Sequence, residues 1–175
     1  MNRFDDTQLY PLILQEDFGN IEKFLKKYGI DSVDRDGRSF LTNTIEEGKN
    51  EFAKKLIDLG ADINQQDNNG STPLFAAIRA HNTEMINFLL NDPKIDSNAT
   101  DKVGKNALRI ALQFHPRDKE LLLNLVKKGI DPFIADNNGI TPYSLMLRYQ
   151  SGKITKGGEK LDFSPVLEEI ELSKS

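Results

Sequence analysis

One turn motif recurs four times in this chain at nearly constant spacing. Asp34, Asp67, Asp101 and Asp136 each open a segment of the form Asp-x-x-Gly, and these aspartates lie 33, 34 and 35 residues apart. A second mark, a glycine or proline followed within three residues by an aspartate, precedes each motif at 29–31, 60–62, 93–96 and 129–131. A period of this length predicts a repeat architecture, in which each unit buries its apolar face only against its neighbours.

Each repeat has the sequence signals of a turn followed by two helices. The Asp carboxylate can bond the backbone that follows it, and the Gly permits a positive φ. Ser or Thr next to Pro or an apolar residue then predicts a capped helix, which in the clearest copy covers 74–80. A longer helix follows, with apolar residues at helical spacing such as Met85, Ile86, Leu89 and Leu90, and Gly60 and Gly129 are expected as left-handed caps.

These features resemble the ankyrin repeat from about residue 29 to residue 149. The segment 72–77, Thr-Pro-Leu-Phe-Ala-Ala, is similar to the T-P-L-H-x-A signature, and 56–64 is similar to the segment that joins the second helix to the next hairpin. Phe75 replaces the usual histidine, and Phe40 and Ala107 replace the proline that opens the first helix. The resemblance implies an all-α solenoid of about five stacked helix pairs joined by hairpin loops.

The domain boundaries follow from the spacing of the repeats. We expect a single domain over 1–175, with central repeats at about 34–66, 67–100 and 101–135 and caps at 1–30 and 141–175. The first cap should contain helices at 9–15 and 21–28. The last cap should contain a helix over 141–149, a flexible glycine- and lysine-containing loop over 151–163 and a helix over 164–172.

Composition excludes several classes of function. The chain has no cysteine, so disulfides, cysteine-based zinc sites and thiol chemistry are ruled out. Its 23 basic and 27 acidic residues give a net charge of −4, which disfavours nucleic acid and anionic lipid as partners of the whole chain. No stretch is long enough for a membrane span or a signal peptide, so a cytoplasmic location is expected.

Motifs for catalysis or cofactor binding are weak. Residues 32–43 have the spacing of a calcium loop, but the twelfth position is Asn43 rather than glutamate, and the hairpin explains the same residues. His81 and His115 both fall in turns between helices, where His81 is expected to adopt a left-handed conformation, and both lack further metal ligands at suitable spacing. We therefore expect no enzyme activity, no metal and no cofactor.

The resemblance implies a partner-binding surface on the concave face and the hairpin tips. Carried over to this sequence, it predicts twelve contact positions: Arg35, Arg38, Glu46, Glu47, Arg79, Lys102, Val103, Lys105, Phe114, Ile140, Arg148 and Tyr149. With Asp36, also on a hairpin tip, this surface carries six basic and three acidic residues, a net +3 on an acidic chain. Such a surface favours a protein partner with an acidic patch.

The predicted function is a non-catalytic protein–protein interaction module that is monomeric on its own. An alternative within this class is a bacterial immunity-type inhibitor of a toxin or enzyme, because small solitary ankyrin proteins with this residue usage resemble such inhibitors. Nucleic-acid binding through the basic groove is a less favoured alternative. The inter-helix turn at 114–118 has two extra residues relative to the other repeats. In an alternative interpretation, Phe114 packs against this enlarged turn and Tyr149 packs against the C-terminal loop.

Overall fold

The computed structural model describes residues 4, 6–15, 18–153 and 159–174, and the regular secondary structure in these ranges is helical. The described residues form no strand, only an isolated bridge between Val33 and Ser39. The helices of the described ranges are α1 (Asp6–Gln15), α2 (Phe18–Tyr28), α3 (Phe40–Glu46), α4 (Asn50–Asp58), α5 (Pro73–Arg79), α6 (Thr83–Asn91), α7 (Ala107–Phe114), α8 (Lys119–Lys127), α9 (Pro142–Gln150) and α10 (Ser164–Leu172).

The helices fall into two compact units, unit 1 (residues 1–96) and unit 2 (residues 97–175). Unit 1 contains α1 to α6, and unit 2 contains α7 to α10. The predicted single domain and its repeat boundaries remain predictions. The all-α stack of helix pairs, by contrast, is confirmed in each unit.

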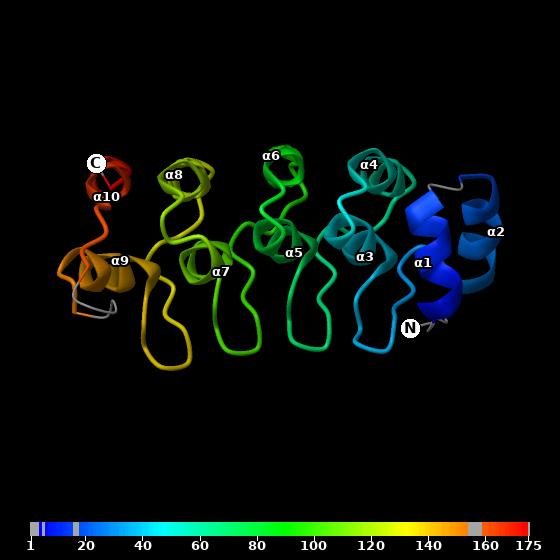
Figure 1. Ribbon diagram of the computed structural model, residues 1–175, viewed down its shortest axis with the longest axis horizontal. Helices are drawn as coiled ribbons and strands as arrows, with labels where there is room; N and C mark the ends of the chain where they lie inside the picture. The colour runs from blue at the N-terminus through cyan, green and yellow to red at the C-terminus, as the bar shows by residue number, and fades with distance from the viewer. Residues whose placement is uncertain (1–3, 5, 16–17, 154–158, 175) are drawn as a thin grey trace. The chain divides into compact units, whose positions relative to one another are not determined.

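In unit 1, consecutive helix pairs stack side by side. Figure 1 shows α3 and α5 in one row, α4 and α6 in a second row, and the hairpin loops projecting from the first row away from the second. Aromatic rings join successive helices, with the Phe40 ring 5.4 Å from that of Phe24 and 5.7 Å from that of Phe52. All three rings are buried, so the core is continuous from α2 through the α3–α4 pair, both within that pair and between it and its neighbour.

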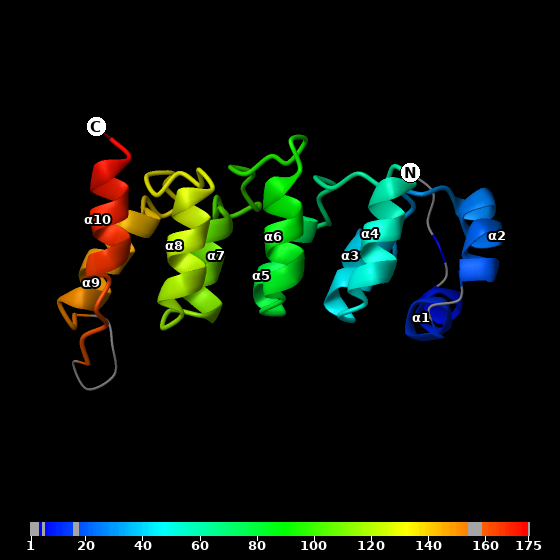
Figure 2. The same ribbon diagram turned by 90° about the horizontal axis from the view of Figure 1, so that it is seen from above.

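Unit 2 repeats this arrangement. Its first helices, α7 and α9, pack on each other, while α10 packs on α8 (Figure 2). Phe163, which precedes α10, is fully buried, although the sequence placed it in a flexible loop. Of that predicted loop, 154–158 lie outside the described residues. Its described parts are 151–153, a turn that follows α9, and 159–163, which end in the core because the Phe163 ring packs against Tyr149.

The first helices of the three central repeats and of the C-terminal cap each begin where a polar side chain caps them. Ser39, Thr72, Asn106 and Thr141 each accept a hydrogen bond from the backbone N–H three residues later. Because the cap alone satisfies this N–H, the helices that open with Phe40 and Ala107 start in the same register as those that open with proline. The predicted left-handed turns are also confirmed: φ is 54° at His81, 97° at Gly60 and 83° at Gly129.

Candidate functional site

A single carboxylate shapes each hairpin and thereby positions the predicted contact residues. One oxygen of Asp101 accepts hydrogen bonds from the backbone N–H groups of Val103 (3.0 Å) and Lys105 (2.8 Å). Asp136 binds Asn138 and Ile140 in the same way, at 2.9 and 3.1 Å. These bonds close the turn and leave the intervening side chains, including Lys102 and Val103, exposed at the tip.

Successive hairpins within a unit are also bonded to each other. The backbone N–H of Asn137 donates to the carbonyl of Val103 at 2.9 Å, and its side-chain amide donates to the carbonyl of Lys102 at 3.1 Å. In unit 1 the N–H of Asn68 donates to the carbonyl of Asp36 at 3.0 Å. The tips that carry the candidate residues are therefore held in fixed register with their neighbours.

The carboxylate of Asp136, which closes the last hairpin, has a shifted pKa. Burial of Asp136 alone would raise its pKa, but the backbone hydrogen bonds from Ile140 and Asn138 outweigh this effect, and Arg109 lies nearby. The pKa of Asp136 is therefore lowered from its usual value. The Arg109 guanidinium lies 3.5 Å from the second Asp136 oxygen. This pair couples α7 to the following hairpin and is structural.

In unit 1, the basic candidate residues are bound by acidic neighbours. Arg38 contacts the buried carboxylate of Asp34 at 2.9 Å and that of Glu46 at 3.0 Å. Arg79 reaches the other oxygen of Glu46 at 3.2 Å. Burial disfavours the Arg38 cation, but the charge of Asp34 and its hydrogen bond to Arg38 dominate and raise the pKa of Arg38. These contacts form one network across two repeats.

The charge of the predicted surface is distributed unevenly between the two units. Among the hairpin and first-helix positions, unit 1 holds Arg35, Arg38 and Arg79 against Asp36, Glu46 and Glu47, a net charge of zero. The predicted excess of +3 lies entirely in unit 2, on Lys102, Lys105 and Arg148. Arg35, Glu47, Lys102 and Arg148 are exposed, while Arg38, Glu46, Arg79 and Lys105 are half-buried.

The apolar candidates also lie in unit 2 and differ in exposure. Val103 is 48% exposed and Phe114 is 46% exposed, whereas Ile140 is half-buried. Lys105 links the hairpin to α7, because its ammonium donates to the side chain of Gln113 at 2.8 Å, next to Phe114. The hairpin tip and the end of α7 thus form one surface with apolar and basic side chains.

Tyr149 differs from the other apolar candidates because it packs on the segment before α10. Its ring lies 6.0 Å from that of Phe163, and its carbonyl accepts the backbone N–H of Leu161 at 3.3 Å. Tyr149 is half-buried, and Arg148 beside it is exposed. A substitution at Tyr149 would therefore disturb the attachment of α10 as well as any partner contact.

Sequence reasoning missed the pairing of Glu46 with Arg79. The two residues are 33 residues apart, one repeat, and so occupy the same position in successive first helices. Opposite charges at equivalent positions of adjacent repeats were the signal that could have predicted this ion pair. Asp34, treated only as a turn residue, is also the buried counter-charge of Arg38.

The described part of the chain shows neither a metal site nor a membrane span. In these residues, no group of three or more histidine, aspartate or glutamate side chains could hold a metal ion. No helix in the described ranges is long and apolar enough to cross a membrane.

Comparisons with known proteins agree with the geometry. A family model described as ankyrin repeats, in three copies, matches residues 9–101 and 41–136. An ankyrin repeat protein of Acanthamoeba polyphaga mimivirus is 31% identical over 117 residues, which cover 58% of this chain and 16% of that protein. The Notch protein of Drosophila melanogaster is 35% identical over 80 residues, 46% of this chain and 3% of Notch.

A longer match, with human transient receptor potential cation channel subfamily A member 1, is 30% identical over 149 residues, which cover 81% of this chain and 13% of the channel. The chain thus spans 16% or less of each of these three relatives.

Proposed function

We propose that this chain, which belongs to the ankyrin-repeat family, is a protein-binding module whose main contact surface lies in unit 2. Ankyrin repeats generally mediate protein–protein interaction, and the family is generally non-catalytic. The observation that carries the proposal is the pair of exposed apolar side chains, Val103 and Phe114, beside Lys102 and Lys105.

The chemistry of this surface suits an acidic protein partner with an apolar anchor point. Exposed aromatic and aliphatic side chains supply most binding energy when they become buried at the centre of an interface. The surrounding positive charge accelerates encounter with an acidic patch and sets its orientation. Arg148, exposed on α9, extends the basic surface.

The unit 1 candidates have a secondary role in this proposal. Arg38 and Arg79 already bind Glu46, so a partner carboxylate would have to compete with an existing network. Breaking such pairs offsets much of the energy gained from new ones. We therefore expect Arg35 and Glu47, the exposed members of unit 1, to tune specificity rather than affinity.

A capture experiment with a matched control tests this surface. The tagged chain and its Val103→Glu, Phe114→Glu variant would be used to retain proteins from a native lysate of the source cells, with quantification by mass spectrometry. A Leu59→Glu variant serves as the control, because Leu59 is 51% exposed but lies after α4 in unit 1. The proposal requires a partner that the control retains and the double variant loses at least tenfold. A partner retained equally by all three proteins would refute the assignment of this surface.

Separate assays of the purified chain and of the captured partner test the predicted inhibitor role, nucleic-acid binding, oligomeric state and location. If the chain is an immunity-type inhibitor, adding it to the captured partner should abolish that partner's enzymatic or toxic activity at one-to-one stoichiometry. Nucleic-acid binding would instead appear as salt-dependent anisotropy changes with labelled oligonucleotides. Sedimentation velocity and cell fractionation test the expected monomeric state and cytoplasmic location.

A further inference from the structure

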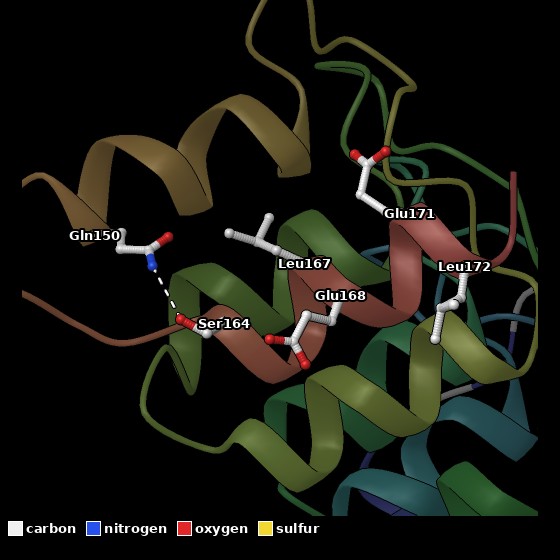
Figure 3. A pocket seen from close by; sticks show the side chains of 6 residues that line it. All are labelled: Gln150, Ser164, Leu167, Glu168, Glu171 and Leu172. Carbon is white, nitrogen blue, oxygen red and sulfur yellow. Dashed lines mark hydrogen bonds between the residues drawn. The ribbon is translucent and has the colours of Figure 1, made fainter.

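The last helix pair of unit 2 carries a groove that the surface described above does not use. It has a volume of about 580 Å³ and is lined by Gln150 of α9 and by Ser164, Leu167, Glu168, Glu171 and Leu172 of α10. Figure 3 shows Glu168 and Glu171 projecting on either side of Leu167, and Gln150 hydrogen-bonded to Ser164 at one end. The groove therefore combines an apolar floor with acidic edges.

The groove lies on the side of α10 that faces away from α8. Val166 and Ile170 are buried, and Glu169 approaches Lys127 of α8, so these residues mark the packed side of α10. Leu172, by contrast, is 70% exposed.

On α9, Tyr143, Leu147 and Gln150 share one face by helical spacing. Tyr143 and Gln150 both bond to α10, and Leu147 between them is 44% exposed. Exposed leucines thus occur on both helices of this pair.

One end of the groove already holds a cation. The ammonium of Lys174 lies 4.5 Å from the ring centre of Phe133 and 5.2 Å from that of Tyr143. It also contacts a carboxylate oxygen of Glu171 at 2.9 Å, and the Tyr143 hydroxyl donates to the same oxygen at 3.1 Å. Two aromatic faces and a carboxylate form a site for a lysine or arginine side chain, which the chain fills with its own lysine.

The electrostatics of this end favour positive charge for two further reasons. The hydrogen bond from Lys174, followed by that from Tyr143, lowers the pKa of Glu171 from its usual value, so Glu171 is ionised at neutral pH. The last turn of α10 contains no basic residue, and the C-terminal end of a helix carries a partial negative charge.

We propose that the α9–α10 groove is a second docking site, and that its occupant is a basic amphipathic helix of a partner protein. Apolar side chains of that helix cover Leu167 and Leu172, and one of its lysine or arginine side chains replaces Lys174 between Phe133, Tyr143 and Glu171. Lys174 then acts as an internal competitor that weakens binding until it is displaced. This groove shares no residue with the surface around Val103 and Phe114.

A peptide titration tests the proposal. The probe is a fluorescein-labelled 15-residue peptide of leucine and lysine with the leucines at i, i+3, i+4 and i+7. Its partner peptide has the same composition but leucines distributed around the helix. Fluorescence anisotropy at near-physiological salt should show tighter binding of the patterned peptide to the full chain. Equal affinity for both peptides would mean that net charge alone drives binding and would overturn the proposal.

Matched variants locate the binding site. Leu172→Ser with Glu171→Gln should weaken binding of the patterned peptide about tenfold, because it removes an apolar contact and the counter-charge. The control, Leu59→Ser with Glu120→Gln, changes composition and charge identically at exposed positions elsewhere and should leave affinity within twofold. Similar losses in both proteins would refute the assignment to this groove.

Removal of the competing lysine gives the sharpest test. Lys174→Ala should raise the affinity about fivefold, since the peptide no longer displaces a cation held by two rings and a carboxylate. Lys153→Ala, the same charge change at another exposed lysine, should have little effect. Equal effects of the two substitutions would show that Lys174 is not a competitor.

Two further measurements distinguish peptide binding in the groove from binding at the unit 2 hairpin surface and from self-association of the chain. The Val103→Glu, Phe114→Glu variant should bind the patterned peptide as the unmodified chain does. If it does not, the peptide occupies the unit 2 hairpin surface and the groove proposal fails. A dimer in sedimentation velocity that Leu172→Ser dissociates would assign the groove to a second copy of the chain, which also overturns the proposal.

Discussion

Alanine substitutions at two hairpin glycines distinguish two contributions to the free energy of unfolding: the cost of a positive φ and the contact between successive hairpins. Gly37 and Gly139 occupy equivalent hairpin positions and have φ of 81° and 73°. A Cβ on Gly139 would meet nothing within 4 Å, whereas a Cβ on Gly37 would lie 2.5 Å from the side-chain oxygen of Asn68 and 2.8 Å from its backbone nitrogen. The two substitutions therefore share the cost of a positive φ, and only one of them adds a clash with the next hairpin.

The magnitudes follow from these distances. A non-glycine residue in the left-handed region costs about 1–2 kcal/mol, and the loss of chain entropy in the unfolded state offsets about 0.4–1 kcal/mol of that cost. Gly139→Ala should thus destabilise by about 1 kcal/mol. Gly37→Ala must also move Asn68 and break its hydrogen bonds to the carbonyls of Asp36 (3.0 Å) and Arg35 (3.2 Å). At about 1 kcal/mol for each bond, the total is about 3 kcal/mol.

Urea denaturation followed by circular dichroism and by tyrosine fluorescence measures this difference. Two probes are needed because repeat arrays can lose two-state behaviour. Gly104→Ala serves as an internal replicate in unit 2, because its Cβ would lie 2.9 Å from the side-chain oxygen of Asn137. Its cost should resemble that of Gly37→Ala. If Gly37→Ala and Gly139→Ala agree within about 0.5 kcal/mol, the contact between hairpins contributes nothing and the reasoning is wrong.

Three further substitutions probe the core, the hairpin charge and the C-terminal anchor. Leu89→Ala should lower the free energy of unfolding by about 2–5 kcal/mol in urea denaturation, because Leu89 is fully buried and its truncation leaves a cavity. The lowered pKa of Asp136 means that the unfolded chain binds a proton more readily than the folded one. Its contribution is therefore complete above the usual value of 3.8, and it disappears as the pH falls through the lower folded pKa. Asp136→Asn should flatten the acid limb of a pH titration of the denaturation midpoint, and an unchanged limb would exclude this carboxylate as its cause. Phe163→Ala should cost about 3–5 kcal/mol and increase hydrogen exchange in α10, whereas a surface-like cost below about 0.5 kcal/mol would contradict its burial.

The sequence predicted the repeat fold well because its signals are local. Asp-x-x-Gly specifies a turn whose hydrogen bonds lie within five residues, and an N-cap such as Thr72 acts within one helical turn. These signals recur in every repeat, so a weak signal in one repeat can be interpreted by comparison with the equivalent positions of the others. The positive φ of His81 was predicted for the same reason, since its place in the turn between helices is set by the repeat.

The candidate site was harder to predict because it depends on contacts between repeats. The charge of the predicted surface was counted residue by residue, but the buried Asp34 and the Glu46–Arg79 pair redistribute it. Exposure of an aromatic side chain likewise depends on what packs beside it. Phe114 is exposed as the binding hypothesis expects, whereas Tyr149 meets Phe163 from a segment that carries no repeat signal.

The backbone hydrogen bonds between the tips of successive hairpins run in one direction. In both units the later tip donates and the earlier one accepts, from Asn68 to Asp36 and from Asn137 to Val103, with partners 32 and 34 positions apart in the chain. An insertion or deletion of one whole repeat therefore adds or removes a hydrogen-bond donor together with its acceptor. An insertion or deletion of a few residues within a repeat would instead separate the donor from its acceptor. Lineages that carry this architecture should accordingly vary in length by multiples of the period, and small insertions should collect in the turns between helices, where the 114–118 segment already contains extra residues.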